Sequence, residues 1–217
     1  MMGIIFALEF KRFCARPSWL LLGALILASA PLSLSPYFPR FFPALACGLT
    51  VVGNDLMDMF GSRDREIRKL VALPLDLQDV ILGKGFMTMV KAAIATAVAG
   101  VVHAWLAGPS DDSSQALLTG LGFLATMPPL VHIGARLSIA AISKPSPGVL
   151  EPLVRVVLTL LAAAVCGIPA FVLATTTHSA PALAAYAALS LSIWMTVGAR
   201  GSARRLERWM QSPAYDL

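Results

Sequence analysis

The chain has 217 residues, of which 57% are hydrophobic and only 13% are charged, and its net charge is +5. Soluble domains carry roughly 25% charged residues, so this composition excludes an ordinary soluble domain. The basic residues alternate with apolar stretches instead of gathering on one segment. This distribution argues against a nucleic-acid partner and favours membrane topology signals, with the lipid bilayer as a partner.

The first 16 residues are predicted to form an interfacial elbow helix that lies along the membrane surface. Phe6, Phe10 and Phe13 recur at helical spacing on one face, whereas Glu9 and Arg12 share the opposite face. The alternative is that this segment extends the first membrane span.

Six apolar segments follow, each close to the ~20 residues that cross a hydrocarbon core. The predicted spans are 18–34, 41–60, 80–106, 116–142, 153–174 and 182–199. The fold class is therefore predicted to be all-α, a polytopic membrane protein with one transmembrane domain over residues 1–217. Lys and Arg concentrate in alternate connections, which places both termini and a basic tail, 200–217, in the cytosol.

Two features of these spans predict how they pack and bend. Ala92, Thr96 and Gly100 recur every four residues, and such a stripe of small residues allows another helix to approach closely in lipid. Pro128 and Pro129 are expected to break or kink the fourth span, because proline lacks the amide hydrogen that the helix needs.

The most charged internal segment is the predicted cytosolic loop 61–79, which contains a short helix ended by Pro74. Asp76 and Asp79 then resemble an N-cap and an acidic first turn for the third span. The short helix has an apolar edge flanked by charges, which either contacts the headgroups or a protein groove, or is a solvated amphipathic helix. The residues singled out in it are Arg63, Arg65, Glu66, Ile67, Arg68, Leu70 and Val71.

A second candidate site is an ion pair near the cytosolic ends of the second and third spans. Asn54, Asp55 and Asp58 lie about one turn inside one end, and Lys91 lies at similar depth on the next helix, beyond an interfacial Lys84. Charges in a bilayer are costly without a partner or water, so these residues form either a gate or side chains that snorkel to the headgroups.

No motif in the sequence indicates that this chain makes or breaks covalent bonds. The three cysteines are widely separated and the three histidines lack metal-ligand spacing, so we expect no metal and no bound cofactor. Gly83-Lys84-Gly85 lacks the remaining residues of a phosphate-binding loop. We therefore expect that the chain is not an enzyme.

The chain resembles the permease subunits of ABC-2 type ATP-binding cassette exporters. The resemblance lies in an elbow helix, six spans, and a first cytosolic loop that reaches Leu73-Pro74 and continues through Leu82-Gly83-Lys84. Arg136 to Pro145 is similar to the second cytosolic turn of that family. The link of 168–181 is short for the re-entrant helices that many relatives carry between spans five and six.

The resemblance implies a permease in the cell (inner) membrane that dimerises and binds a separate ATP-binding cassette ATPase subunit. ATP and Mg²⁺ would then be bound by that subunit, and residues 63–71 would act as the coupling helix. The mostly small, apolar spans favour a hydrophobic or amphipathic substrate. The substrate itself, export against import, and homodimer against heterodimer are left open.

Two other functions are consistent with the same residues. A non-transporting membrane scaffold or assembly factor would need no ATPase, and the loop 61–79 would then contact no motor. A membrane-embedded enzyme acting on lipid would use the cluster at residues 54–58, although that cluster supplies few metal ligands.

Overall fold

The computed structural model of the chain describes residues 2–15, 23–24, 26–28, 31, 42–58, 76–107, 113–142, 154, 157–158, 161, 165, 167–170, 172–173 and 180–211. Every element among them is a helix: α1 (Met2–Ala15), α3 (Phe42–Asp58), α5 (Leu77–Ala107), α6 (Ser113–Ile142), α8 (Ala180–Ile193), the π-helix η1 (Trp194–Gly198) and α9 (Ala199–Met210). The all-α fold class is confirmed for this part of the chain. Most of the predicted first and fifth spans lies outside it.

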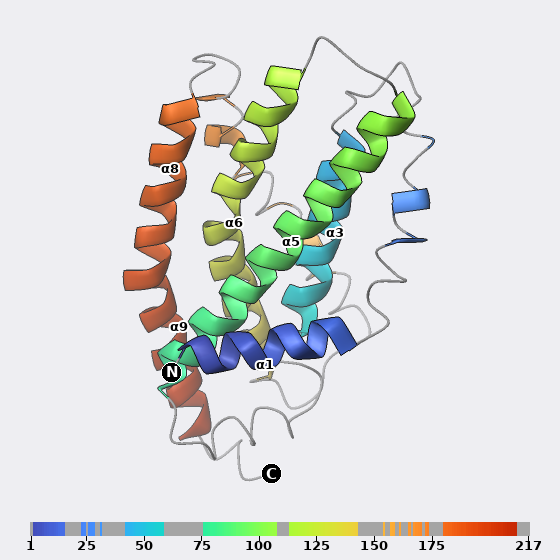
Figure 1. The fold of residues 1–217 in the computed structure, drawn as a ribbon. Helices are drawn as coiled ribbons and strands as arrows, with labels where there is room; N and C mark the ends of the chain where they lie inside the picture. Colours follow the sequence, from blue (N-terminus) through green and yellow to red (C-terminus); the bar gives the residue numbers. More distant parts are fainter. Residues whose placement is uncertain are drawn as a thin grey trace.

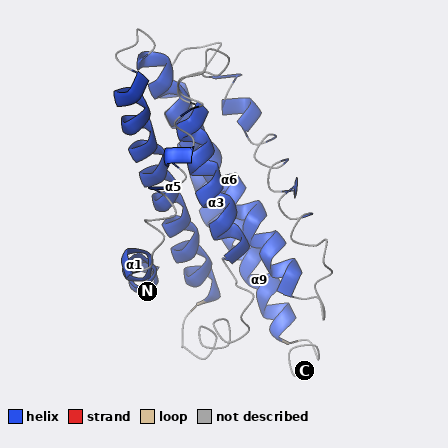
Figure 2. Cartoon of the chain, turned by 90° about the vertical axis from the view of Figure 1, so that its right-hand side faces the viewer, coloured by secondary structure: helices blue, strands red, loops and turns tan. Residues whose placement is uncertain are grey.

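The long helices form a bundle whose lower end carries α1 and α9 (Figure 1). α3 packs against α5 and runs in the opposite direction, and α5 and α6 are likewise antiparallel neighbours. α8, η1 and α9 form one unbroken helical run beside α6. α1 lies across the lower end against α5, and it is seen end-on after a 90° turn (Figure 2).

Local signals for two of these helices are confirmed. The Asp76 side chain accepts a hydrogen bond from the Gln78 amide at 2.8 Å, so Asp76 is the N-cap of α5, and Asp79 lies in the first turn. In α1 the rings of Phe6 and Phe10 stack with their centroids 6.3 Å apart, as their spacing predicts.

Two helix boundaries differ from the sequence prediction. α6 continues through Pro128 and Pro129, so the helix is not broken there, and the expected alternative of a kink stays a prediction. Both prolines lie within a packed part of the bundle, where neighbouring helices hold the chain in helical form despite the missing amide hydrogens. The predicted sixth span ends at Ala199, yet the helix runs on as α9 to Met210, which makes part of the basic tail helical.

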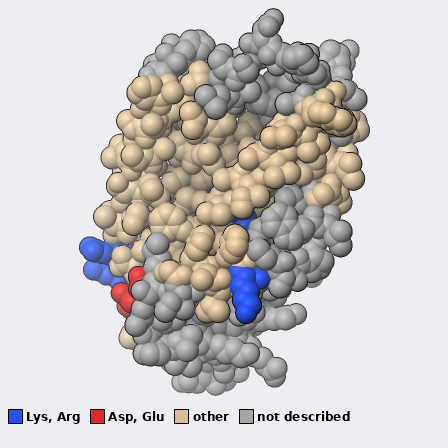
Figure 3. Space-filling model, in the orientation of Figure 1, with Lys and Arg blue, Asp and Glu red and all other residues tan. Residues whose placement is uncertain are grey.

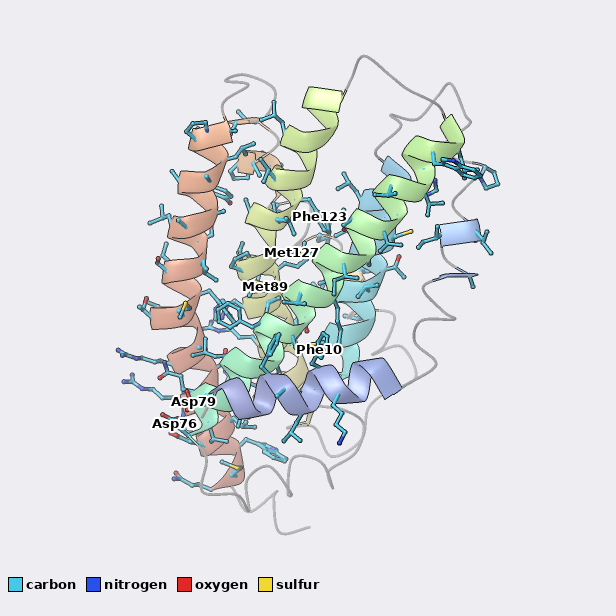
Figure 4. The ribbon with its side chains drawn as sticks, viewed as in Figure 1. Phe10, Asp76, Asp79, Met89, Phe123 and Met127 are labelled. Atoms are coloured by element: carbon cyan, nitrogen blue, oxygen red, sulfur yellow. The ribbon has the colours of Figure 1, made fainter. Side chains whose placement is uncertain are left out.

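The interior of the bundle is formed by side chains from all the long helices. Val52 of α3, Ile81 of α5, Met127 and Leu130 of α6, and Trp194 of η1 belong to one buried cluster. Figure 4 shows Phe123 and Met127 of α6 together with Met89 of α5 between the helices. This cluster fixes the positions of α3, α5, α6 and η1 relative to one another.

Two segments among the described residues are long and apolar enough to cross a membrane, Leu77–His103 and Ala180–Met210. Only 33% and 22% of their most apolar windows are buried, whereas a core helix of a soluble protein is mostly buried. Large apolar side chains point outward instead, including Val101, Trp105 and Val197. These two helices support, at a coarse level, a membrane protein.

The charged side chains of the described residues are confined to the lower half of the bundle. On the face shown in Figure 3 they lie beside α1 and α9, and the upper half carries none. They are Glu9 and Lys11 of α1, Asp76, Asp79, Lys84 and Lys91 in and just before the first half of α5, Arg136 of α6, and Arg200, Arg204, Arg205, Glu207 and Arg208 of α9.

Two helices of the bundle carry long charge-free stretches. From Ala180 to Ala199 the chain carries no charge, which corresponds to about 30 Å of helix at ~1.5 Å per residue. The charge-free part of α6, from Ser113 to Ala135, is about 34 Å long by the same measure. Both lengths match the ~30 Å thickness of a bilayer hydrocarbon core. On α5, Lys84 and Lys91 lie within the height of these stretches, because Gly85 is level with Val131 and Trp194.

Candidate functional site

The interface between α3 and α5 positions the candidate ion pair. A Cβ atom added to Gly48 of α3 would overlap the Thr96 hydroxyl of α5, and one added to Gly100 would lie 3.9 Å from the Ala44 Cβ atom. Ala92 is also fully buried. The predicted stripe of small residues on α5 is therefore confirmed, and α3 is the helix that packs on it.

These contacts set the register of the antiparallel pair. Residue 44 lies level with residue 100 and residue 48 with residue 96, so residue 55 lies level with residue 89. Lys91 is two residues from that level, about 3 Å along the helix, whereas Asp58 is five residues from the level of Lys91, about 7.5 Å. The register thus brings Asp55 closer than Asp58 to the height of Lys91.

The backbone positions of Asp55 and Lys91 also lie on the sides of α3 and α5 that face each other. Asp55 follows Val52 by three residues, and Val52 is buried in the core. Lys91 precedes Ala95 by four residues, and Ala95 packs with Ala44 and other residues of α3. The side chains of Asn54, Asp55 and Asp58 lie outside the described part of the structure, so the ion pair stays a prediction.

The predicted coupling helix cannot be placed, because all of its residues lie outside the described part of the chain. These residues are Arg63, Arg65, Glu66, Ile67, Arg68, Leu70 and Val71. The described chain does show what the loop joins: it connects the lower end of α3 to the lower end of α5.

Lys84 is buried among the helices, with only 9% of it exposed, and its expected depth at the membrane interface stays a prediction. The reason for the burial is that α5 begins at Leu77, about 10 Å earlier along the helix, and packs against α1, α3, α6 and α9. Lys84 lies two turns before Lys91, with the buried Thr88 between them. Extending the small-residue stripe downward by the same periodicity would have predicted this burial.

A second polar cluster, absent from the sequence prediction, surrounds the π-helix η1. Trp194 is 2% exposed and its ring meets Phe86 of α5 edge to face, with centroids 5.3 Å apart. A Cβ atom on Gly85 would overlap the Trp194 ring, so the glycine makes room for it. The side-chain amide of Gln78 donates to the Met195 carbonyl at 3.5 Å and so ties the start of α5 to this turn.

Unpaired polar atoms gather where α6 meets η1 and α9. A Cβ atom on Gly198 would lie 2.9 Å from the His132 Nδ1 atom and 3.1 Å from the Trp194 ring. The Nδ1 atom of His132, the Nε1 atom of Trp194 and the hydroxyl of Ser202 are buried and find no hydrogen-bond partner within the described structure. π-Helical turns are frequent at functional sites, and this one brings together hydrogen-bonding groups of three kinds.

The described residues do not form a metal centre, since no group of three or more His, Cys, Asp or Glu side chains among them converges. The polar side chains of the site offer hydrogen bonds and charges, which are suited to positioning neighbouring helices and to conformational change.

No protein-family model matches the chain. No curated protein matches it.

Proposed function

We propose that the chain is the transmembrane permease subunit of an ABC-2 type exporter, located in the cell membrane with both termini in the cytosol. The observation that carries the membrane part is that α6 and the run from Ala180 to Ala199 have charge-free stretches of membrane thickness, while most charged side chains of the described residues lie at the lower end of the bundle. Cations outnumber anions among the described residues at this end, which supports a cytosolic location for it by the positive-inside rule.

The position of α1 supports the same assignment. It lies across the lower end, at the level where the charged residues begin, as an interfacial elbow helix would (Figure 1). Its exposed Phe10 would enter the headgroup region, and its exposed Lys11, about 100° away around the helix, would remain in water. The six-span topology completes this proposal, since segments 18–34 and 153–174 have the length and composition of spans.

The assignment to ABC-2 exporters rests on the sequence resemblance in the loop 61–79 and the start of the third span. In this mechanism a partner ATPase subunit, which binds ATP and Mg²⁺, pushes on the coupling helix 63–71. Because α3 and α5 flank the loop and interlock at Gly48 and Thr96, a push on the loop would move both helices as one unit. A second permease subunit would complete a pathway for a hydrophobic or amphipathic substrate.

The test is affinity purification of the tagged chain in mild detergent, followed by mass spectrometry and an ATPase assay of the co-purified proteins. The variant Ile67→Asp/Leu70→Asp places charges on the apolar edge of the loop helix. The control Gln211→Asp adds a charge at the exposed end of α9, outside the proposed contact. We expect an ATP-binding cassette subunit with the wild type and with the control, and its loss from the double variant.

Two results would count against the proposal. Absence of any ATPase from the wild-type sample would favour the membrane scaffold. If the double variant retained the ATPase, the chain would still be a permease, but residues 63–71 would not be the segment that contacts the ATPase.

A further inference from the structure

We propose that one face of α9 binds the phosphate groups of anionic phospholipids in the leaflet at the lower end of the bundle. This arginine face consists of Arg200, Arg204, Arg205 and Arg208. The inference rests on the membrane location proposed above. It adds a specific lipid-binding surface that neither coupling to an ATPase nor transport requires.

The four arginines share the outward side of α9. All four are exposed, and at ~100° per residue they cover an arc of about 140°. The opposite side, with Ser202, Ala203 and Leu206, is buried against the bundle. The exposed Glu207 borders the face.

The guanidinium groups of this face are available to bind an outside partner. No described residue forms an ion pair with any of the four arginines, Glu207 included. The side-chain bond that the structure records runs within the face, from the Arg208 Nε atom to the Arg204 carbonyl at 3.4 Å. Four unpaired guanidinium groups side by side form a strong site for phosphate, which each can bind through two parallel hydrogen bonds.

The arginine face continues an exposed apolar stripe without interruption. Leu189, Ile193 and Val197 are 61%, 54% and 67% exposed along α8 and η1, and Arg200 follows on the same outward side. One continuous surface therefore changes from apolar to cationic within a single helical turn. A phospholipid has the matching order of acyl chain and phosphate, whereas an acidic protein would not require the apolar part.

Along the helix Arg200 lies nearest the apolar stripe, Arg204 and Arg205 lie at nearly the same height below it, and Arg208 lies lowest. Arg200 and Arg204 lie about 4.5 Å and 10 Å below Val197, and Arg205 and Arg208 lie about 12 Å and 16 Å below it. The headgroup region of one leaflet is roughly 5–8 Å thick. We therefore expect Arg200 to contact the phosphates, Arg204 and Arg205 to reach the outer edge of the headgroup region with their long side chains, and Arg208 to lie mainly in water. The inner pair Arg200 and Arg204 is on average about 6.5 Å closer to the apolar stripe than the outer pair Arg205 and Arg208.

The experiment is native mass spectrometry of the delipidated full chain, titrated with phosphatidylglycerol or phosphatidylcholine of the same acyl chains. The double variants R200Q/R204Q and R205Q/R208Q lose equal charge at different heights. Each headgroup contact is worth about fivefold in affinity, so we expect the inner double variant, which loses Arg200 and the more peripheral Arg204, to weaken phosphatidylglycerol binding by about 5- to 25-fold. The outer double variant should change it less than about fivefold. Phosphatidylcholine binding should weaken less than phosphatidylglycerol binding in the inner double variant, because choline offsets the charge of its phosphate.

Other outcomes would overturn the inference. Equal losses in both double variants would mean that net charge alone attracts the lipid. Displacement of phosphatidylglycerol by millimolar inorganic phosphate would assign the face to a free anion. Unchanged lipid binding with loss of a co-purifying protein in R200Q/R204Q would assign the face to a protein contact.

Failure of the underlying membrane assignment has a separate readout. A chain that does not float with vesicles of pure phosphatidylcholine after an alkaline wash would refute membrane insertion itself. A chain that floats but shows no preference for phosphatidylglycerol over phosphatidylcholine would refute only the arginine face. Circular dichroism of each variant, matched to the wild type, shows that the exposed substitutions leave the helices intact.

Discussion

The two glycines of α3 should respond in opposite directions to the same substitution. A Cβ atom on Gly48 would overlap the Thr96 hydroxyl and come within 2.8 Å of the Phe123 ring, so α3 is locked between α5 and α6 at this point. A Cβ atom on Gly53, one and a half turns later, would meet nothing within 4 Å. Both positions lie in the same helix, so Gly53→Ala is the matched control for Gly48→Ala.

Two opposing contributions determine how far each substitution changes the free energy of unfolding. Replacing glycine by alanine in a helix stabilises it by about 0.8–1 kcal/mol at either position. At Gly48 the added methyl group also overpacks the interface, which costs about 1–3 kcal/mol. The free energy of unfolding of Gly48→Ala should therefore lie roughly 1–3 kcal/mol below that of Gly53→Ala, since the helix term cancels in the comparison.

The assay is reversible unfolding in mixed dodecyl maltoside and dodecyl sulfate micelles, followed by circular dichroism. Thr96→Ala removes the atom that the new methyl group would overlap. Its hydroxyl has no partner in the described structure, so that change alone should cost little. In a double-mutant cycle, Gly48→Ala with Thr96→Ala should recover at least about 0.5 kcal/mol. Equal unfolding free energies for Gly48→Ala and Gly53→Ala would refute the packing argument.

Three further predictions use the same unfolding assay. Asp76→Ala should lower the free energy of unfolding by about 1 kcal/mol through loss of the N-cap of α5, and Asp76→Asn should lower it less; equal losses would exclude capping. Gly85→Ala should destabilise by up to about 2 kcal/mol, because the overlap of its methyl group with the Trp194 ring costs about 1–3 kcal/mol and the helix gain of about 0.8–1 kcal/mol offsets only part of it, and adding Trp194→Leu should recover part of that loss; a stabilising Gly85→Ala would contradict the contact. Asp55→Lys and Lys91→Asp should each destabilise and their combination should restore stability; a double variant worse than both single ones would rule out the ion pair.

The sequence predicts best those features that are encoded by neighbouring residues. The N-cap at Asp76 depends on a hydrogen bond within its own turn, and the stacking of Phe6 on Phe10 depends on helical spacing alone. The stripe through Ala92 and Thr96 was also predictable, because small residues at four-residue spacing have few other uses in an apolar helix.

Features that depend on contacts between distant segments were not predicted. The π-helix at Trp194–Gly198 contains ordinary helix-compatible residues, and its position is tied to the packing of Trp194 against Gly85, more than a hundred residues earlier. The burial of Lys84 was also not predicted, although the four-residue spacing of the small-residue stripe on α5 extends to this position.

The π-helix has a consequence for comparing this chain with other proteins. An i→i+5 turn holds about one residue more than the α-helical turn it replaces. A protein with one residue fewer between Trp194 and Gly198 would therefore present the same faces of α8 and α9 to its neighbours with a regular helix. Alignments of this chain should allow a one-residue gap in that turn. Without the gap, every position of α9 would be matched to its neighbour, about 100° away around the helix, and Arg205 would be paired with the equivalent of the buried Leu206.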